Sequence, residues 1–349
     1  MTITLPRDLD FMNAVEFCKK MWELEEDKEY LFDFINLQFT EPFTLAYISI
    51  EMKRFAKSRE GQCRAQRFEH LTYQAHMGFF RAFGLSHGKE PGEATGSSTY
   101  LPITILNIEE LKEEAYDMGY EIGELLERKA EKIAEILTRQ NSNELVETLT
   151  FSIREILRNV VEHSKSEIIE YCAQYWPSKY LVEVAIFDTG IGIKEGLSTN
   201  PFLEIENERD AIHMALLPSI SGKMYKGVYI DKNNPWQNSG YGLYMTSRIC
   251  RKGSDFIVLS NNSGLLFTSD EKIDVNCNYK GTALRLRIDT RNLSSCREML
   301  AIFREEGEKK AKELNQEGVM IKASIASTML KKDFKDGLKN KIFRNFRKI

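Results

Sequence analysis

REILRNVVEHS, at residues 154–164, and IFDTGIGI, at residues 186–193, are the stretches that decide how this chain folds. In the first, Glu155, Asn159 and His163 are spaced four residues apart, so they share one face of a helix, while the apolar residues between them point to a core. In the second, an apolar strand ends in a carboxylate that is followed by two glycines. The two stretches predict an amphipathic helix and, further along the chain, a buried strand.

The spacing of Glu155 and Asn159 suits the chemistry of ATP hydrolysis. An Asn side-chain oxygen can coordinate Mg²⁺, and a carboxylate one helical turn before it can orient and deprotonate a water molecule. Any amphipathic helix presents polar residues at this spacing, however, so the motif alone does not distinguish a site from a solvated helix face.

Asp188 and the glycines after it suit the recognition of a purine base. A carboxylate at the end of a strand can accept a hydrogen bond from an adenine amino group, and Gly190 and Gly192 let the backbone approach the base and ribose without a Cβ clash. The stretch lacks the G-x-G-x-x-G pattern, opening a helix, that a dinucleotide-binding fold requires. It also lacks the alternating acidic residues of a calcium loop.

Two further motifs follow. Gly240 and Gly242 precede an amphipathic helix in NSGYGLYMTSRIC, residues 238–250, and backbone N–H groups at such a helix start favour phosphate. Thr282 opens a strand in KGTALRLRI, residues 280–288, where its hydroxyl could hold the base edge or a water molecule. Taken by itself, the first of these motifs is better explained by a plain glycine turn before a helix, and the second carries almost no information.

Together the four motifs resemble the GHKL family, the nucleotide-binding fold shared by gyrase-like ATPases and histidine kinases. They occur in the family's order and secondary-structure contexts across residues 142–289. The resemblance implies an α/β fold, a Bergerat-type two-layer α/β sandwich with a mixed sheet, and ATP and Mg²⁺ as cofactors. It also implies a role for each matched residue: general base for Glu155, magnesium ligand for Asn159, adenine-binding carboxylate for Asp188, adenine loop for Gly190 and Gly192, phosphate loop for Gly240 and Gly242, and a position near adenine for Thr282. His163 is expected to support these residues or to be structural.

The remaining pattern of this region predicts a β-hairpin at residues 166–187 and strands at 256–260, 265–268 and 282–288. Residues 194–239 correspond to the ATP lid of the family. Lys223 or Lys226 in this loop could reach a γ-phosphate as a point charge. Lysine is usually exposed, so a solvated lid side chain is the simpler interpretation of both.

Residues 1–107 predict a small α/β domain that resembles a STAS domain of the anti-anti-sigma class. Its strand is expected at residues 30–37, and its following helix is expected to begin at Pro42. The family's D-S-x-G turn is replaced by T-E-P-F-T, so Thr40 or Thr44 would stand in for the phosphorylated residue by position only. The R-E-x-x-x-N-x-x-x-H form of the first motif is also similar to serine kinases that act on STAS proteins.

The other segments are expected to be mainly helical. Residues 108–141 predict a connector with apolar residues at helical spacing, which suits either a helix packed on the next domain or a short dimerising coiled coil. Residues 290–349 predict a C-terminal extension that ends in a basic amphipathic helix. Nucleic acid or an acidic protein could dock on that helix, although its apolar stripe also suits packing on the chain itself.

Composition limits the alternatives. The net charge of −4 gives no whole-chain reason to expect nucleic acid or anionic lipid as a partner. The six cysteines are scattered, without a C-x-x-C pair or a His cluster, so neither a zinc site nor a disulfide framework is indicated. No run approaches the ~18 apolar residues of a membrane span, and the first residues lack a signal segment. We therefore expect a cytoplasmic protein with no membrane partner.

The resulting functional prediction is a Mg-dependent ATP-binding protein, which hydrolyses ATP slowly and acts as a conformational switch in signalling or defence, as a homodimer. One alternative is a Ser/Thr or His protein kinase acting on a STAS-type or other partner. A histidine kinase acting on itself is disfavoured, because none of the five His residues lies in an H-[ED]-x-x-[TN]-P box. The other alternative is a binding module in which ATP is structural.

Overall fold

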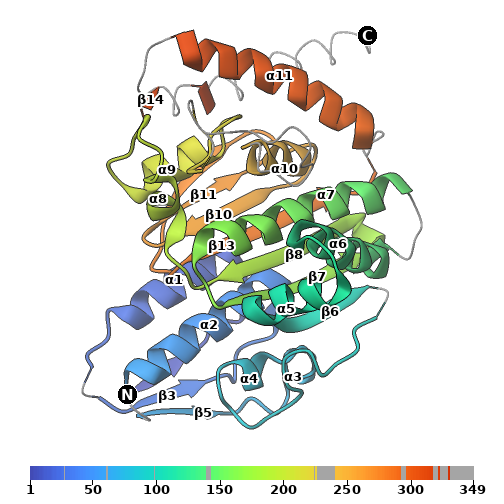
Figure 1. The fold of residues 1–349 in the computed structure, drawn as a ribbon. Helices are drawn as coiled ribbons and strands as arrows, with labels where there is room; N and C mark the ends of the chain where they lie inside the picture. The colour runs from blue at the N-terminus through green and yellow to red at the C-terminus, as the bar shows by residue number, and fades with distance from the viewer. Residues whose placement is uncertain are drawn as a thin grey trace, which may run out of the picture.

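A seven-stranded sheet forms the centre of the fold in the computed structural model (Figure 1). Its strands follow the order β12-β11-β10-β13-β8-β7-β6, and every neighbouring pair is antiparallel. The expectation of a mixed sheet is therefore wrong for this sheet. The strands are β6 (Tyr100–Asn107), β7 (Ile168–Trp176), β8 (Leu181–Asp188), β10 (Phe256–Ser260), β11 (Ser263–Phe267), β12 (Lys272–Asn276) and β13 (Thr282–Asp289). The structure describes residues 1–26, 28–59, 62–97, 99–138, 143–223, 225, 240–291, 296–316, 321–322 and 329–330.

The hairpin of β7 and β8 confirms the pattern seen in the sequence. Trp176 pairs with Leu181 across the short 3₁₀ turn Pro177–Lys179, and Tyr180 closes the turn in the left-handed conformation, with φ of 53°. Both strands bury residues on both faces, which is typical of strands that are covered on both sides of a sheet.

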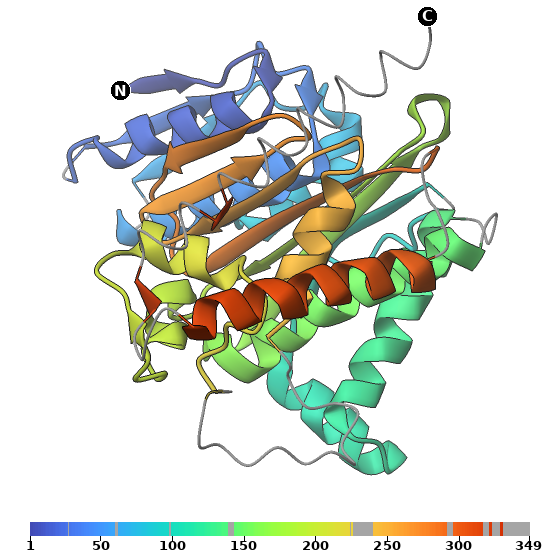
Figure 2. The same ribbon diagram turned by 90° about the horizontal axis from the view of Figure 1, so that it is seen from above.

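Helices α6, α7 and α10 cover one face of the central sheet, and α11 packs outside α7 and α10 (Figure 2). Side chains along β8 point alternately to the two faces of the sheet. Val184 and Ile186 belong to the core under these helices, whereas Ala185 and Phe187 belong to the core on the opposite face. The helices are α6 (Ile122–Thr138), α7 (Asn143–Asn159), α10 (Gly242–Cys250) and α11 (Cys296–Gln316).

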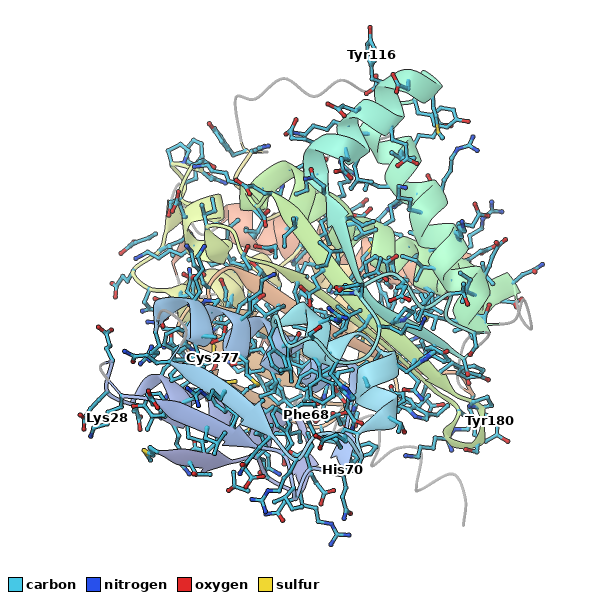
Figure 3. All side chains as sticks on the ribbon, turned by 90° about the horizontal axis from the view of Figure 1, so that it is seen from below. Lys28, Phe68, His70, Tyr116, Tyr180 and Cys277 are labelled. Carbon is cyan, nitrogen blue, oxygen red and sulfur yellow. The ribbon has the colours of Figure 1, made fainter. Side chains whose placement is uncertain are left out.

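The predicted connector is two helices rather than one. Helix α5 (Ile108–Met118) ends at Gly119, whose φ of 70° lies in the left-handed region that favours glycine, and α6 follows at Ile122. The apolar face of α6 is buried against α7 and the sheet, so packing within the chain accounts for its helical spacing. At the free end of this helix pair, Tyr116 is 86% exposed (Figure 3).

The N-terminal part of the chain covers the other face of the central sheet and adds two layers to the sandwich, one of helices and one of strands. Helices α1 (Phe11–Trp22) and α2 (Pro42–Ser58) lie between the central sheet and a small parallel sheet, and α2 contacts β7 and β8. Helix α2 begins at Pro42 as predicted. The small sheet has the order β1-β3-β5, formed by β1 (Thr2–Thr4), β3 (Tyr30–Asp33) and β5 (Cys63–Gln66). The short elements β2 (Asp8–Leu9), β4 (Phe39–Thr40), α3 (Thr72–His76) and α4 (Phe79–Ala82) complete this part.

The position of β6 does not fit the predicted domain boundary at residue 107. The boundary places this strand in the N-terminal domain, whereas in the structure it pairs with β7 at the edge of the central sheet. The N-terminal layer and the sheet also share one hydrophobic core, in which Phe43 and Tyr47 of α2 lie against Phe187 and Tyr279. The first 107 residues are therefore not packed as a separate unit.

Charged residues are buried where α2 meets the central sheet. Arg285 on β13 donates to Asp255 over 2.7 Å and to Glu41, at the start of α2, over 2.9 Å. Arg287 donates to Glu183 over 2.6 Å, and the other oxygen of Glu183 accepts from the Phe43 amide. The Glu183 side chain is 0% exposed. This ion-pair cluster fastens the N-terminal layer to the sheet.

Thr40 and Thr44 lie at the same boundary and are both buried. The Thr44 hydroxyl donates to the Leu9 carbonyl over 2.7 Å and accepts from the Glu41 amide, which forms a capping box at the start of α2. The Thr40 hydroxyl accepts from the Gln74 amide. Neither hydroxyl is presented to a kinase in this arrangement.

The described part of the C-terminal extension is α11 together with the short strand β14 (Ile321–Lys322), which pairs in parallel with β9 (Leu203–Glu204). The predicted basic helix at the end of the chain lies outside the described residues. Within the described ranges, none of the helices has the length and apolar character needed to cross a bilayer.

Candidate functional site

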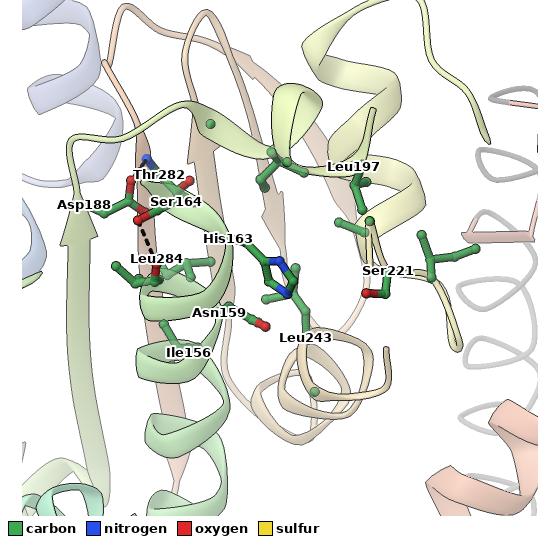
Figure 4. Close-up of a pocket in the computed structure, with 18 of the residues that line it drawn as sticks. Ile156, Asn159, His163, Ser164, Asp188, Leu197, Ser221, Leu243, Thr282 and Leu284 are labelled. Carbon is green, nitrogen blue, oxygen red and sulfur yellow. Dashed lines mark hydrogen bonds between the residues drawn. The ribbon is translucent and has the colours of Figure 1, made fainter. Parts of the chain in front are cut away.

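A pocket opens where α7 and β8 end and where β13 and α10 begin (Figure 4). It is partly open to solvent, and apolar side chains with a few polar groups line it, as is common in ligand pockets. Six of the eight residues predicted from the motifs line it: Asn159, Asp188, Gly192, Gly240, Gly242 and Thr282. The remaining two, Glu155 and Gly190, lie just outside the lining. Helices α8 (Gly192–Leu197) and α9 (Glu208–Ala215) supply the opposite wall.

The end of α7 is wound as a π-helical turn, Val160–Ser164. Such turns are rare and often occur at functional sites. The turn places His163 on the pocket wall, on the same side of the helix as Asn159 (Figure 4). Burial lowers the pKa of His163, so the imidazole is neutral at physiological pH. His163 is thus a lining residue, closer to the site than the sequence led us to expect.

Asp188 is the carboxylate in the lining of the pocket, and it is only 3% exposed. Its Oδ1 accepts from the Gly190 amide over 2.8 Å and from the Thr282 amide over 3.3 Å. Thr282 stands opposite Asp188 in the register of β13 and β8, which explains how residues far apart in the sequence meet. Burial raises the pKa of Asp188 to about 6, although the bonds from Gly190 and Thr282 oppose that shift.

Gly190 and Gly281 allow the backbone to close tightly around Asp188. A Cβ at Gly190 would lie 2.0 Å from the Ser164 carbonyl oxygen, and a Cβ at Gly281 would lie 2.3 Å from the Asp188 carbonyl oxygen. Gly281 also has a φ of 102°, which larger residues rarely adopt. Because these two glycines lack a Cβ, the backbone can pack closely where the end of α7, the end of β8 and the start of β13 meet.

Glu155 does not line the pocket. Its carboxylate packs against Gly242, where a Cβ would lie 2.3 Å from Glu155 Oε2. Because Gly242 does line the pocket, the carboxylate lies immediately behind the first residue of α10. A glycine at this position is what lets α7 and α10 approach so closely.

Sequence reasoning missed the polar residues that hold the loop after β8. Glu208 on α9 accepts from the Lys194 amide over 3.0 Å and from Asn261 over 3.1 Å, and it also accepts from the Ser260 hydroxyl. The same hydroxyl accepts from the Ile193 amide over 2.8 Å. These bonds fix α8 against the turn between β10 and β11, but the residues form no motif that the sequence alone could reveal.

In the predicted lid, Lys223 donates from Nζ to the Glu162 carbonyl oxygen at the end of α7. This bond places the lysine beside the pocket in the structure. Lys226 and the rest of the lid up to residue 239 lie outside the described residues.

Asn159 is the residue suited to a magnesium ion. Across the described residues, His, Cys, Asp and Glu side chains do not gather in any group of three or more that could hold a metal. A Mg²⁺ that is bound together with ATP needs no such group, because phosphate oxygens and water fill most of its coordination positions and the protein supplies one or two oxygens. A single amide oxygen on the pocket wall fits that requirement.

Comparisons with known proteins add no family assignment. The chain matches none of the protein-family models against which it was compared, and no curated protein matches it either.

The raised pKa of Asp188 predicts a pH dependence for the ATP binding that we expect at this pocket. A charged carboxylate is the stronger acceptor for an amino group, so the affinity for ATP should fall as the pH is lowered through about 6, where Asp188 takes up a proton in the free protein. Calorimetric titrations between pH 5 and 7.5 measure this. The Asp188→Asn variant controls for titration of the phosphate groups and should show a smaller fall; equal falls in both proteins would contradict the role of Asp188.

Proposed function

We propose that this chain binds Mg·ATP in the pocket in the manner of GHKL ATPases and hydrolyses it slowly. The observation that carries the proposal is the buried Asp188 carboxylate at one end of the pocket, with Asn159 on the adjoining helix wall and the start of α10 also lining it. Adenine would be recognised by Asp188, and the phosphates would lie near Asn159 and the backbone N–H groups at the start of α10.

The residues have distinct roles in this proposal. Asn159 would hold Mg²⁺, which when bound would neutralise charge on the phosphates. Glu155 would accept a proton from the attacking water, which requires its carboxylate to reach past Gly242 from its present position. The neutral His163 could donate to a phosphate oxygen through one ring nitrogen.

The switch would act through the layers around the sheet. The Tyr279 hydroxyl donates to the Asp188 carbonyl oxygen over 2.9 Å, and the Tyr279 ring lies 5.8 Å from the ring of Tyr47 on α2. Tyr279 and Tyr47 would thereby connect a nucleotide at Asp188 to the N-terminal layer. We propose that this layer is STAS-like. A homodimer remains a prediction, which sedimentation with and without Mg·ATP tests.

Incubation with γ-labelled ATP tests the proposed reaction against its alternatives. We expect the wild type to release free labelled phosphate slowly. We expect Glu155→Ala to bind ATP but to release no phosphate. Label retained on protein would favour a kinase, and the burial of Thr40 and Thr44 predicts that it would not be on either of them. Bound ATP with neither product would favour a structural nucleotide.

A further inference from the structure

A second hollow lies on the outer side of α7, away from the ATP pocket. It is bounded by α6, α7 and α11 and lined mainly by charged side chains, among them Glu127, Arg128, Arg154 and Arg304, together with the aromatic ring of Phe151. Arg154 directly precedes the proposed base Glu155. The residue that lines this hollow and the residue that packs against Gly242 of the ATP pocket are therefore neighbours in the sequence.

Arg154 holds one oxygen of the Glu155 carboxylate with two donors. Its Nη2 lies 2.7 Å and its Nε 3.1 Å from Glu155 Oε1. The Arg154 side chain is 22% exposed and that of Glu155 is 12% exposed. This pair is shielded from water, so it is not one of the exposed ion pairs that contribute little.

Neighbours outside the pair hold the Arg154 side chain in this position. Consecutive residues on a helix do not face one another, so an arginine pairs with the next residue only if its side chain is guided there. Phe151, one turn earlier, lies under the guanidinium at 5.3 Å, and Glu127 on α6 lies 3.5 Å from Arg154 Nη1. Helix α6 is thus connected to Glu155 through one guanidinium.

We propose that Arg154 is a positioning residue that restrains Glu155 and thereby slows ATP hydrolysis. This inference rests on the proposed function of the pocket. The restraint keeps Glu155 Oε1 on the outer side of α7 and Oε2 against Gly242, in a position that does not line the pocket.

Charge also makes the restraint oppose the reaction. In hydrolysis, the water oxygen bonds to the γ-phosphorus, the bond from that phosphorus to the bridging oxygen of ADP breaks, and the water proton moves to Glu155. Protonation removes the negative charge that pairs with Arg154. The guanidinium therefore stabilises the state before proton transfer more than the transition state, which lowers the rate.

The test compares ATP turnover at saturating Mg·ATP in the wild type and Arg154→Ala. We expect turnover to rise roughly tenfold, because charge-assisted hydrogen bonds to the base are lost, while the calorimetric affinity for ATP changes less than about twofold. Glu127→Gln, which removes only the α6 contact, should give a smaller rise. Arg128→Ala, in the same hollow but paired with Glu124, is the matched control and should leave turnover unchanged.

The double variant Arg154→Ala/Glu155→Ala shows whether the effect passes through Glu155. It should be as inactive as Glu155→Ala, and urea unfolding midpoints of the single and double variants should be non-additive, because the residues interact directly. If Arg154→Ala does not fold, Arg154→Gln keeps the side-chain stem on Phe151 and is expected to show the same rise.

The outcomes separate this inference from the proposed function. Failure of the wild type to bind ATP would overturn both. Normal ATP binding with unchanged or slower turnover in Arg154→Ala and Arg154→Gln would overturn the restraint alone. A rise that persists without Glu155 would also overturn it.

Discussion

Asn159→Ala is expected to abolish the dependence of ATP binding on Mg²⁺ while leaving the fold intact. Asn159 is the one predicted metal ligand that lines the pocket, and the described residues hold no carboxylate cluster that could replace it. Wild-type affinity should be at least about tenfold higher with Mg²⁺ than with a chelator, a difference of about 1.4 kcal/mol, and the variant should show no such difference. Calorimetry with and without Mg²⁺ measures both values.

A matched control for this prediction is Asn262→Ala, an exposed asparagine in the turn between β10 and β11 that does not line the pocket. It should bind Mg·ATP as the wild type does. Equal Mg²⁺ dependence in Asn159→Ala and the wild type would remove Asn159 from the magnesium site. Circular dichroism and a thermal melt establish that the variant is folded.

Arg285→Ala is expected to lower the free energy of unfolding far more than a substitution in an exposed ion pair. The arginine is buried between Asp255 and Glu41, so its removal leaves two carboxylates with fewer positive partners in a site that water reaches poorly. Breaking a buried ion pair by removing one partner typically costs about 3–5 kcal/mol. The free energy of unfolding in urea should fall by that amount.

Arg128→Ala again supplies the control, because its pair with Glu124 lies on the surface and such pairs contribute about 0.3–0.5 kcal/mol. Because the Arg285 cluster joins the N-terminal layer to the sheet, the variant should also become more sensitive to proteolysis between residues 1 and 97. A loss of stability no larger than that of Arg128→Ala would show that the cluster does not fasten the layers together.

The sequence predicted the elements whose patterns are local. The β7–β8 hairpin and the start of α2 depend on neighbouring residues, namely the turn at Pro177–Lys179 and the proline at the first helical position. The sheet topology depends on pairing between distant segments. Strand β6 joins β7 across some 60 residues of intervening chain, which no local pattern reveals.

The candidate site shows the same division. Glycine and polar spacing within single motifs placed six residues around one pocket. Gly281, which precedes Thr282 in its motif, proves to be required by a close approach to Asp188. Glu208, Ser260 and Asn261 were missed because their hydrogen bonds join three separate segments, and the position of Glu155 behind Gly242 depends on how closely α7 and α10 pack.

Nucleotide selection tests whether the pocket binds ATP through the Asp188 carboxylate. The measurement is a calorimetric titration of the wild type and of Asp188→Asn with Mg·ATP, repeated in competition with Mg·GTP. We expect the wild type to bind ATP and GTP not to compete at equal concentration. Asp188→Asn should weaken ATP binding by about 1–3 kcal/mol, the contribution of a buried charge-assisted hydrogen bond. Absence of ATP binding, equal competition by GTP, or an unchanged affinity in Asp188→Asn would contradict this proposal.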